Sequence, residues 1–161
     1  MPAPMPETLS TPEIQVLEGP QNPDLAALHQ LWLAKRGTRP MPARADFEPA
    51  EFRSLLPHIM LVDVLPAPDI YRVRLMGQAM IDFHGRNLTG LTPREYAPPE
   101  ALARFTALAR LIVDGRMPVF RAGRAYWVRD KDFKRFESCH LPLSADGISV
   151  NMILGALKFS A

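Results

Sequence analysis

The sequence contains a single cysteine, Cys139, among its 161 residues. One thiol excludes a disulfide within the chain and any zinc site built from several cysteines. No apolar run approaches the roughly 18 residues that suggest a membrane-spanning helix. The first twenty residues contain neither lysine nor arginine, which argues against a secretory signal. We therefore predict a cytoplasmic protein that does not associate with a membrane.

The sequence also lacks the common catalytic and nucleotide-binding motifs. It contains no Gly-x-Ser-x-Gly elbow, no phosphate-binding loop and no dinucleotide fingerprint. The four histidines are scattered, and no two have the spacing that lets a helix hold a metal ion. Cys139 and His140 are neighbours, so on a strand they would point to opposite faces. We accordingly predict a buried thiol, no metal site and no enzymatic activity.

The composition is that of an ordinary globular domain. Apolar residues make up 47% of the chain, charged residues 22%, and the formal net charge is +2. A chain of this length can bury a sizeable core. Residues 1–22 are rich in proline and lack helical periodicity, so we predict a flexible arm, in which residues 13–17 could add a short strand. Residues 23–161 are predicted to form one domain.

An amphipathic helix is predicted directly after the arm. Asn22 has the character of a helix N-cap, and Pro23 fits the first helical position. Gly37 is a plausible stop. Apolar residues recur at spacings of three and four between them, and three are candidates for an interaction surface: Leu28, Leu31 and Trp32. This stripe can pack on the chain's own sheet or on a second copy, and the sequence leaves both alternatives open.

The remaining pattern predicts an α+β domain with an antiparallel sheet. Short helices are expected from Pro49 and over residues 78–84, and a longer helix over residues 99–114. The expected strands cover residues 59–65, 71–75, 119–129, 133–144 and 148–159. An Asp146-Gly147 pair between the last two strands is a typical signal for a tight hairpin.

Several short strings resemble the PAS domain, in particular small bacterial PAS proteins that contain little else. The strings are Leu31-Trp32, residues 42–49, 55–57, 71–77 and 85–90, and 153–157 near the end of the chain. The resemblance covers about residues 25 to 160. It implies a PAS fold, in which a five-stranded antiparallel sheet curves around short helices and one longer helix on one face. The amphipathic N-terminal helix would be added to that fold.

The resemblance also implies a pocket between the sheet and its helices. The candidate lining residues are Met80, Phe83, His84, Phe105, Leu108, Tyr126 and Met152. A pocket of this kind would take a small apolar ligand. The alternative, that these side chains simply fill the core, stays open at this point.

Two cofactors known from PAS domains are disfavoured by the residues present. Formation of a flavin–cysteine adduct needs a cysteine near the Asn-containing turn, where this sequence has Leu88. Haem-binding PAS domains usually bind iron through a histidine on the long helix, and no histidine occurs between Leu91 and Pro118. The cofactor, if any, is therefore not identified by the sequence.

The function that the resemblance implies is that of a stand-alone sensory or regulatory module. It would act by binding a small ligand, a regulatory protein partner or both, and PAS proteins often form homodimers through flanking helices. One alternative is a small α+β enzyme with Asp82 or His84 as base and Tyr126 as hydrogen-bond donor. Another is weak binding of nucleic acid through the basic segment 116–135, although the modest charge of this segment argues against it.

Overall fold

The computed structural model describes residues 14–128, 130–131 and 134–160. Six strands of this part of the chain form one antiparallel sheet in the order β1-β4-β5-β6-β2-β3. The strands are β1 (Ile14–Leu17), β2 (Ile59–Val64), β3 (Tyr71–Met76), β4 (Val119–Arg124), β5 (Arg135–Leu143) and β6 (Met152–Ser160). The strands β4, β5, β6 and β2 therefore lie inside the sheet, and β1 and β3 lie at the edges.

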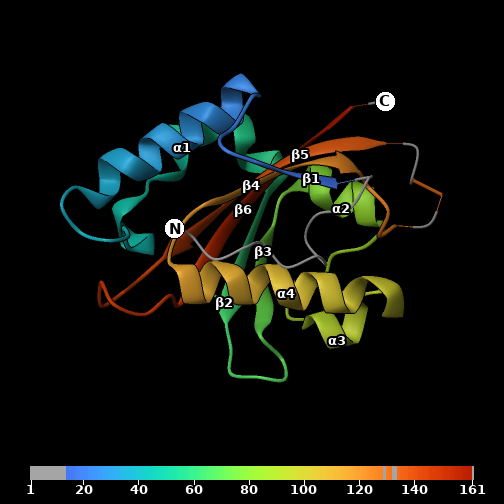
Figure 1. Cartoon of the computed structure of the whole chain (residues 1–161). Helices are drawn as coiled ribbons and strands as arrows, with labels where there is room; N and C mark the ends of the chain where they lie inside the picture. The colour runs from blue at the N-terminus through green and yellow to red at the C-terminus, as the bar shows by residue number, and fades with distance from the viewer. Residues whose placement is uncertain (1–13, 129, 132–133, 161) are drawn as a thin grey trace.

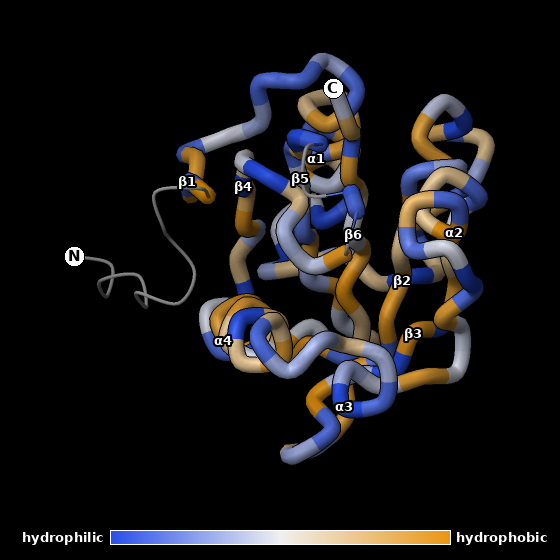
Figure 2. Tube along the Cα trace, turned by 90° about the vertical axis from the view of Figure 1, so that its right-hand side faces the viewer, coloured by the Kyte–Doolittle hydropathy of each residue, from blue (hydrophilic) through white to orange (hydrophobic). Residues whose placement is uncertain are grey.

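Helices cover both faces of this sheet (Figures 1 and 2). The helical segments are α1 (Pro23–Arg36), η2 (Arg44–Asp46), η3 (Pro49–His58), α2 (Gln78–His84), α3 (Pro93–Tyr96) and α4 (Pro99–Gly115). In β4 the Phe120 ring lies 4.8 Å from the His29 ring of α1. The next residue, Arg121, points to the opposite face, because side chains alternate along a strand. That face carries α4.

The sheet has six strands where we expected five, because residues 14–17 form β1. This strand pairs with β4, with Ile14 opposite Gly123 and Leu17 opposite Phe120. Ile14 is 1% exposed, so the strand contributes to the core. The end of the predicted arm is therefore part of the sheet, and the rest of that prediction, over residues 1–13, lies outside the described residues.

Two predicted strands are shorter than the sequence pattern indicated. β4 ends at Arg124, because the Tyr126 N–H turns back to the Arg124 carbonyl. β6 begins only at Met152. The Asp146 carboxylate accepts hydrogen bonds from the N–H groups of Ile148 and Ser149, both at 2.8 Å. These backbone groups are satisfied without a strand partner, so a longer loop replaces the expected tight hairpin.

Helix α1 begins and packs as its sequence dictates. The Asn22 side chain accepts hydrogen bonds from the N–H groups of Asp24 and Leu25, which satisfies donors that the helix itself cannot pair. Leu28 and Trp32 are buried, and the Trp32 Nε1–H donates to the Pro142 carbonyl at 2.8 Å. Leu31, the third candidate for an interaction surface, is half-buried against the core. The apolar face of α1 is thus occupied by the chain's own sheet.

Helices α2 and α4 lie on the other side of the molecule. A Cβ atom at Gly77 would come 2.2 Å from the Leu56 carbonyl oxygen, so only glycine permits this approach of α2 to η3. Helix α4 buries the stripe Ala101, Leu108, Ala109 and Ile112.

None of the described helices is both long and apolar enough to cross a membrane.

Replacing Trp32 by phenylalanine is predicted to lower the free energy of unfolding by about 1–3 kcal/mol, because a buried hydrogen bond is lost. Urea unfolding at neutral pH followed by circular dichroism measures the change. Gln30→Ala is the matched control, since Gln30 lies on the exposed side of the same helix. Equal stability of the Trp32→Phe variant and the parent protein would contradict the packing described for α1.

Candidate ligand-binding site

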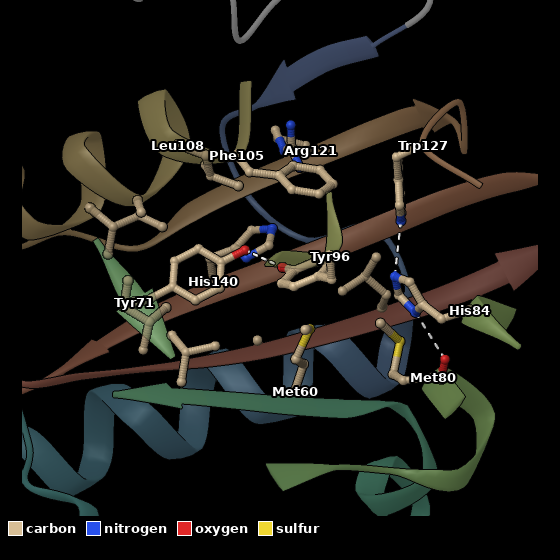
Figure 3. A pocket seen from close by; sticks show the side chains of 16 residues that line it. Met60, Tyr71, Met80, His84, Tyr96, Phe105, Leu108, Arg121, Trp127 and His140 are labelled. Atoms are coloured by element: carbon tan, nitrogen blue, oxygen red, sulfur yellow. Dashed lines mark hydrogen bonds between the residues drawn. The ribbon is translucent and has the colours of Figure 1, made fainter. Parts of the chain in front are cut away.

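A cavity of about 100 Å³ lies between the sheet and helices α2, α3 and α4 (Figure 3). This is well above the roughly 10–15 Å³ that one water molecule needs. Most of its wall is apolar. The lining residues are Met60, Val62, Tyr71, Met80, His84, Tyr96, Phe105, Leu108, Ala109, Ile112, Arg121, Trp127, His140, Ile153, Gly155 and Leu157.

The secondary structure brings these residues together from distant parts of the sequence. The strands supply the floor, with Met60 from β2, Arg121 from β4 and His140 from β5. Helix α4 supplies Phe105 and Leu108 from the opposite side. Alternate residues of a strand share a face of the sheet. Arg121 and His140 lie on the face that α4 covers, so they line the same cavity as Phe105 and Leu108.

His84 is held at the cavity wall through both ring nitrogens. Its Nδ1 lies 2.9 Å from the Met80 carbonyl oxygen, and the Trp127 Nε1–H donates to its Nε2 at 3.3 Å. Since Nε2 accepts, the proton of the neutral ring is on Nδ1 and points to Met80. Burial lowers the pKa of His84. The ring therefore acts as a neutral structural bridge, with no nitrogen left for a base or a metal ligand.

Two tyrosines from different elements meet at the cavity. The hydroxyl groups of Tyr71 in β3 and Tyr96 in α3 are hydrogen-bonded to each other. Burial raises the pKa of Tyr71 to about 12 and raises that of Tyr96 well above its usual value. Both side chains are therefore uncharged at neutral pH and offer the cavity a hydroxyl pair.

Arg121 and His140 place one charge and one neutral ring on the sheet side of the cavity. Arg121 is 5% exposed, and burial lowers its pKa to about 10, so it is still protonated at pH 7. Burial, and then the charge of Arg121, lower the pKa of His140 to about 3. The His140 Nε2 lies 3.0 Å from the Ser138 hydroxyl. Of the described residues that line the cavity, Arg121 alone carries a charge at neutral pH.

Four of the seven residues expected from the sequence line the cavity, namely Met80, His84, Phe105 and Leu108. The other three lie outside the lining. The Phe83 ring stacks on Phe159 with ring centres 4.3 Å apart. The Arg104 guanidinium covers the Tyr126 ring at 4.6 Å, and Met152 is the strand partner of Asp63 and Leu143 at the start of β6.

Sequence reasoning missed five lining residues that determine the cavity's chemistry: Met60, Tyr71, Tyr96, Arg121 and His140. One signal was available. Arg121 is flanked by Phe120 and Ala122 in a strand that lies inside the sheet, between β1 and β5. A charged residue is almost never fully buried unless it is paired, so a lone arginine in such a strand calls for a partner. Tyr71 and Tyr96 give no comparable signal, because their contact depends on the tertiary structure.

The residues behind the alternative functions do not meet in the cavity. Asp82 is exposed and accepts a hydrogen bond from Gln78 at 2.8 Å, away from the lining. Cys139 is buried and is not a lining residue, so the chain's thiol does not reach the cavity. Lys131 of the basic segment donates to the Asp82 carbonyl at 2.6 Å. In the part of the chain that the structure describes, no three His, Cys, Asp or Glu side chains are grouped to hold a metal ion.

A second hollow of about 170 Å³ adjoins the cavity. The two share His84, Tyr96, Phe105 and Trp127, so these four side chains form the wall between them. Arg86 lines only the second hollow. The hydrogen bond between Trp127 and His84 thus lies in a partition between two spaces.

An antiparallel sheet with one longer and several short helices on the cavity side is the architecture of a PAS-type α+β domain. The family model described as "PAS domain" matches residues 21–158, and the chain belongs to that family, whose members are generally sensory modules. None of the curated proteins matches the chain.

Two solved structures show limited likeness to the chain. One is described as an RNA-binding light-oxygen-voltage receptor, with 17% identity, a TM-score of 0.46 and coverage of 66% of this chain and 31% of the receptor. The chain thus matches about a third of that receptor's length. The other is a light-oxygen-voltage domain studied with a flavin analogue, with 16% identity, a TM-score of 0.43 and coverage of 70% and 83%.

Protein stability is predicted to fall between pH 6.5 and pH 5 because of the buried histidines. His140 stays neutral in the folded protein down to about pH 3, whereas in the unfolded chain it gains a proton below about pH 6.5. Unfolding therefore takes up a proton in this range, and acid favours the unfolded state by up to about 1.4 kcal/mol per pH unit for each such group. The lowered pKa values of His29, His58 and His84 act in the same direction.

The variant His140→Gln isolates the contribution of His140, because glutamine can still bond to Ser138 but does not titrate. Urea unfolding at pH 7.5, 6.0 and 5.0 gives the slope of stability against pH. The slope is expected to be smaller in the variant by up to about 1.4 kcal/mol per unit at the acid end. Identical slopes would show that His140 is protonated in the folded protein.

Proposed function

We propose that this PAS protein is a sensory module that binds a small ligand in the cavity between the sheet and α4. The observation that carries the proposal is the cavity itself, which has a volume of about 100 Å³ and is lined by aromatic and aliphatic side chains. A few polar groups, from Tyr71, Tyr96, Arg121 and His140, converge on it. An apolar hollow with a small number of placed polar groups is typical of small-molecule sites.

The wall between the cavity and the adjoining hollow supports a route of entry. It contains Trp127, whose indole is held by a hydrogen bond of 3.3 Å to His84. A rotation of this side chain, which would also break its ring contacts with Phe83, Phe105 and Phe136, would open this part of the wall. We therefore assign Trp127 and His84 the role of a gate through which the ligand reaches the cavity.

The ligand would act by binding one conformation of the protein more tightly than another, which is the only way that binding can shift an equilibrium. The output would be a contact with a regulatory protein partner or a second copy of the chain. Leu28 and Trp32 are buried within the chain, so such a contact would use surfaces other than the inner face of α1. Homodimer formation stays a prediction.

Native mass spectrometry of freshly purified protein tests the proposal. We expect extra mass that disappears on denaturation, and the same spectra report whether the particle is a dimer. The variant Ala109→Leu should lose the extra mass, because Ala109 lines the cavity and is 3% exposed, so the larger side chain fills the hollow. The free variant should be at least as stable as the parent, since filling a cavity commonly stabilises.

Ala103→Leu is the matched control, since it makes the same change on the exposed side of the same helix. It should keep the ligand. Equal extra mass in the parent and in Ala109→Leu would place the ligand elsewhere on the protein. A bare mass, together with no thermal shift in a small-molecule screen, would contradict ligand sensing through this cavity.

A further inference from the structure

Arg121 is a buried cation for which the described residues supply no anion. Its side chain lies at the cavity and is 5% exposed. Its Nε–H has no hydrogen-bond partner, and no carboxylate of the described residues forms an ion pair with it. A buried ionised group is normally paired, because its desolvation is costly unless a counter-charge or hydrogen bonds replace the lost water.

The surroundings of Arg121 offset this cost only in part. The Phe136 ring lies 5.7 Å from the guanidinium carbon, within reach of a cation–π interaction. The oxygens of Tyr126 and Tyr71 favour the charged form, whereas Arg104 opposes it. These are neutral dipoles and a second cation, so no full negative charge balances the guanidinium.

The wider lining shows the same imbalance of charge. The described residues around the cavity and the adjoining hollow include Arg121, Arg86 and neutral histidines, and none of them is acidic. A structural arginine of the core would be expected to bond to carbonyls or carboxylates of the fold. This one instead lies at a hollow whose other walls are Met80, Phe105 and Trp127.

Building on the proposed function, we propose that the cavity binds a small carboxylic acid with an apolar body. The carboxylate would pair with the Arg121 guanidinium, whose planar fork fits a carboxylate with two hydrogen bonds. The apolar body, aliphatic or aromatic, would lie against Phe105, Met80 and Trp127. A dianionic phosphate is a poorer fit, because one arginine neutralises a single charge and the remaining walls are apolar.

The proposal is tested by comparing acids with alcohols of the same carbon skeleton. The probes are octanoate against octan-1-ol, and 4-phenylbutyrate against 4-phenylbutan-1-ol, with octylamine as the cationic counterpart. Binding to the full-length protein is measured by isothermal titration calorimetry at pH 7. We expect at least one acid to bind ten-fold or more tightly than its alcohol, and octylamine not to bind.

The variant Arg121→Met should remove the preference for the acid while leaving the affinity for the alcohol within about two-fold. Arg74→Met is the matched control, since Arg74 lies on an exposed face of β3, paired with Asp63 outside the cavity. It should behave as the parent does. Because the desolvation of this unpaired charge outweighs its contacts with Phe136 and the two tyrosines, free Arg121→Met should melt at the same temperature as the parent or higher.

A second measurement needs no variant. The ¹³C chemical shift of the carboxyl carbon of [1-¹³C]octanoate reports whether the acid is ionised. Pairing with Arg121 should lower the pKa of the bound octanoic acid by at least one unit relative to the free acid. The NMR signals of the indole N–H groups show where the ligand binds. The Trp127 signal should shift on binding, because Trp127 lines the cavity. The signal of Trp32, which is buried on α1, should not shift.

The outcomes separate this proposal from the one on which it rests. If alcohols bind as tightly as acids and move the Trp127 signal, the cavity is a ligand site but its ligand is not an anion. If Arg121→Met keeps the preference for acids, the carboxylate is bound by another group and the proposal is wrong. If neither acids nor alcohols bind, and the purified protein also has a bare mass, both proposals fail together.

Discussion

The register of the central strands determines which chemistry reaches the cavity. β4 pairs with β5 so that Arg121 lies opposite Ser138 and Phe120 lies opposite Cys139. Phe120 therefore faces α1, and Arg121 faces α4. A slip of one residue would exchange the two faces and would place the Arg121 charge beneath α1, where Phe120 now packs against the His29 ring. The hollow can contain polar groups because the opposite face is closed by apolar packing.

Small side chains account for the free space on the α4 side. Ala109 lies on the helix and Gly155 on the floor of the cavity. A Cβ atom at Gly155 would come 3.2 Å from the Met60 carbonyl oxygen and 3.6 Å from the His140 ring, so the position has little room for a side chain without a shift of its neighbours. Gly155 therefore leaves the floor without a side chain, and Ala109 presents only a methyl group to the cavity from the helix.

The sequence predicted local structure well and the chemistry of the site poorly. The Asn22 cap depends on residues near one another in the chain, and it was foreseen. Met80 and His84 were expected in the lining from the resemblance to PAS domains, and both line the cavity. The pairing of Tyr71 with Tyr96 depends on β3 and α3 meeting in space, and no spacing encodes such a contact. Arg121 carried a signal, since a lone charge between apolar neighbours in a strand needs an explanation, but its partners could come only from the fold.

The position of β1 connects the cavity to the N-terminal part of the domain. Val16 of β1 lies opposite Arg121 in the ladder, and β1 is an edge strand whose one strand neighbour in the described sheet is β4. The Glu137 carboxylate of β5 accepts hydrogen bonds from the N–H groups of Gln21 and Asn22 at 2.8–3.1 Å, which fixes the start of α1. A displacement of β4 at Arg121 would therefore move β1, which has no second strand in the described sheet to hold it, while the start of α1 stays fixed to β5.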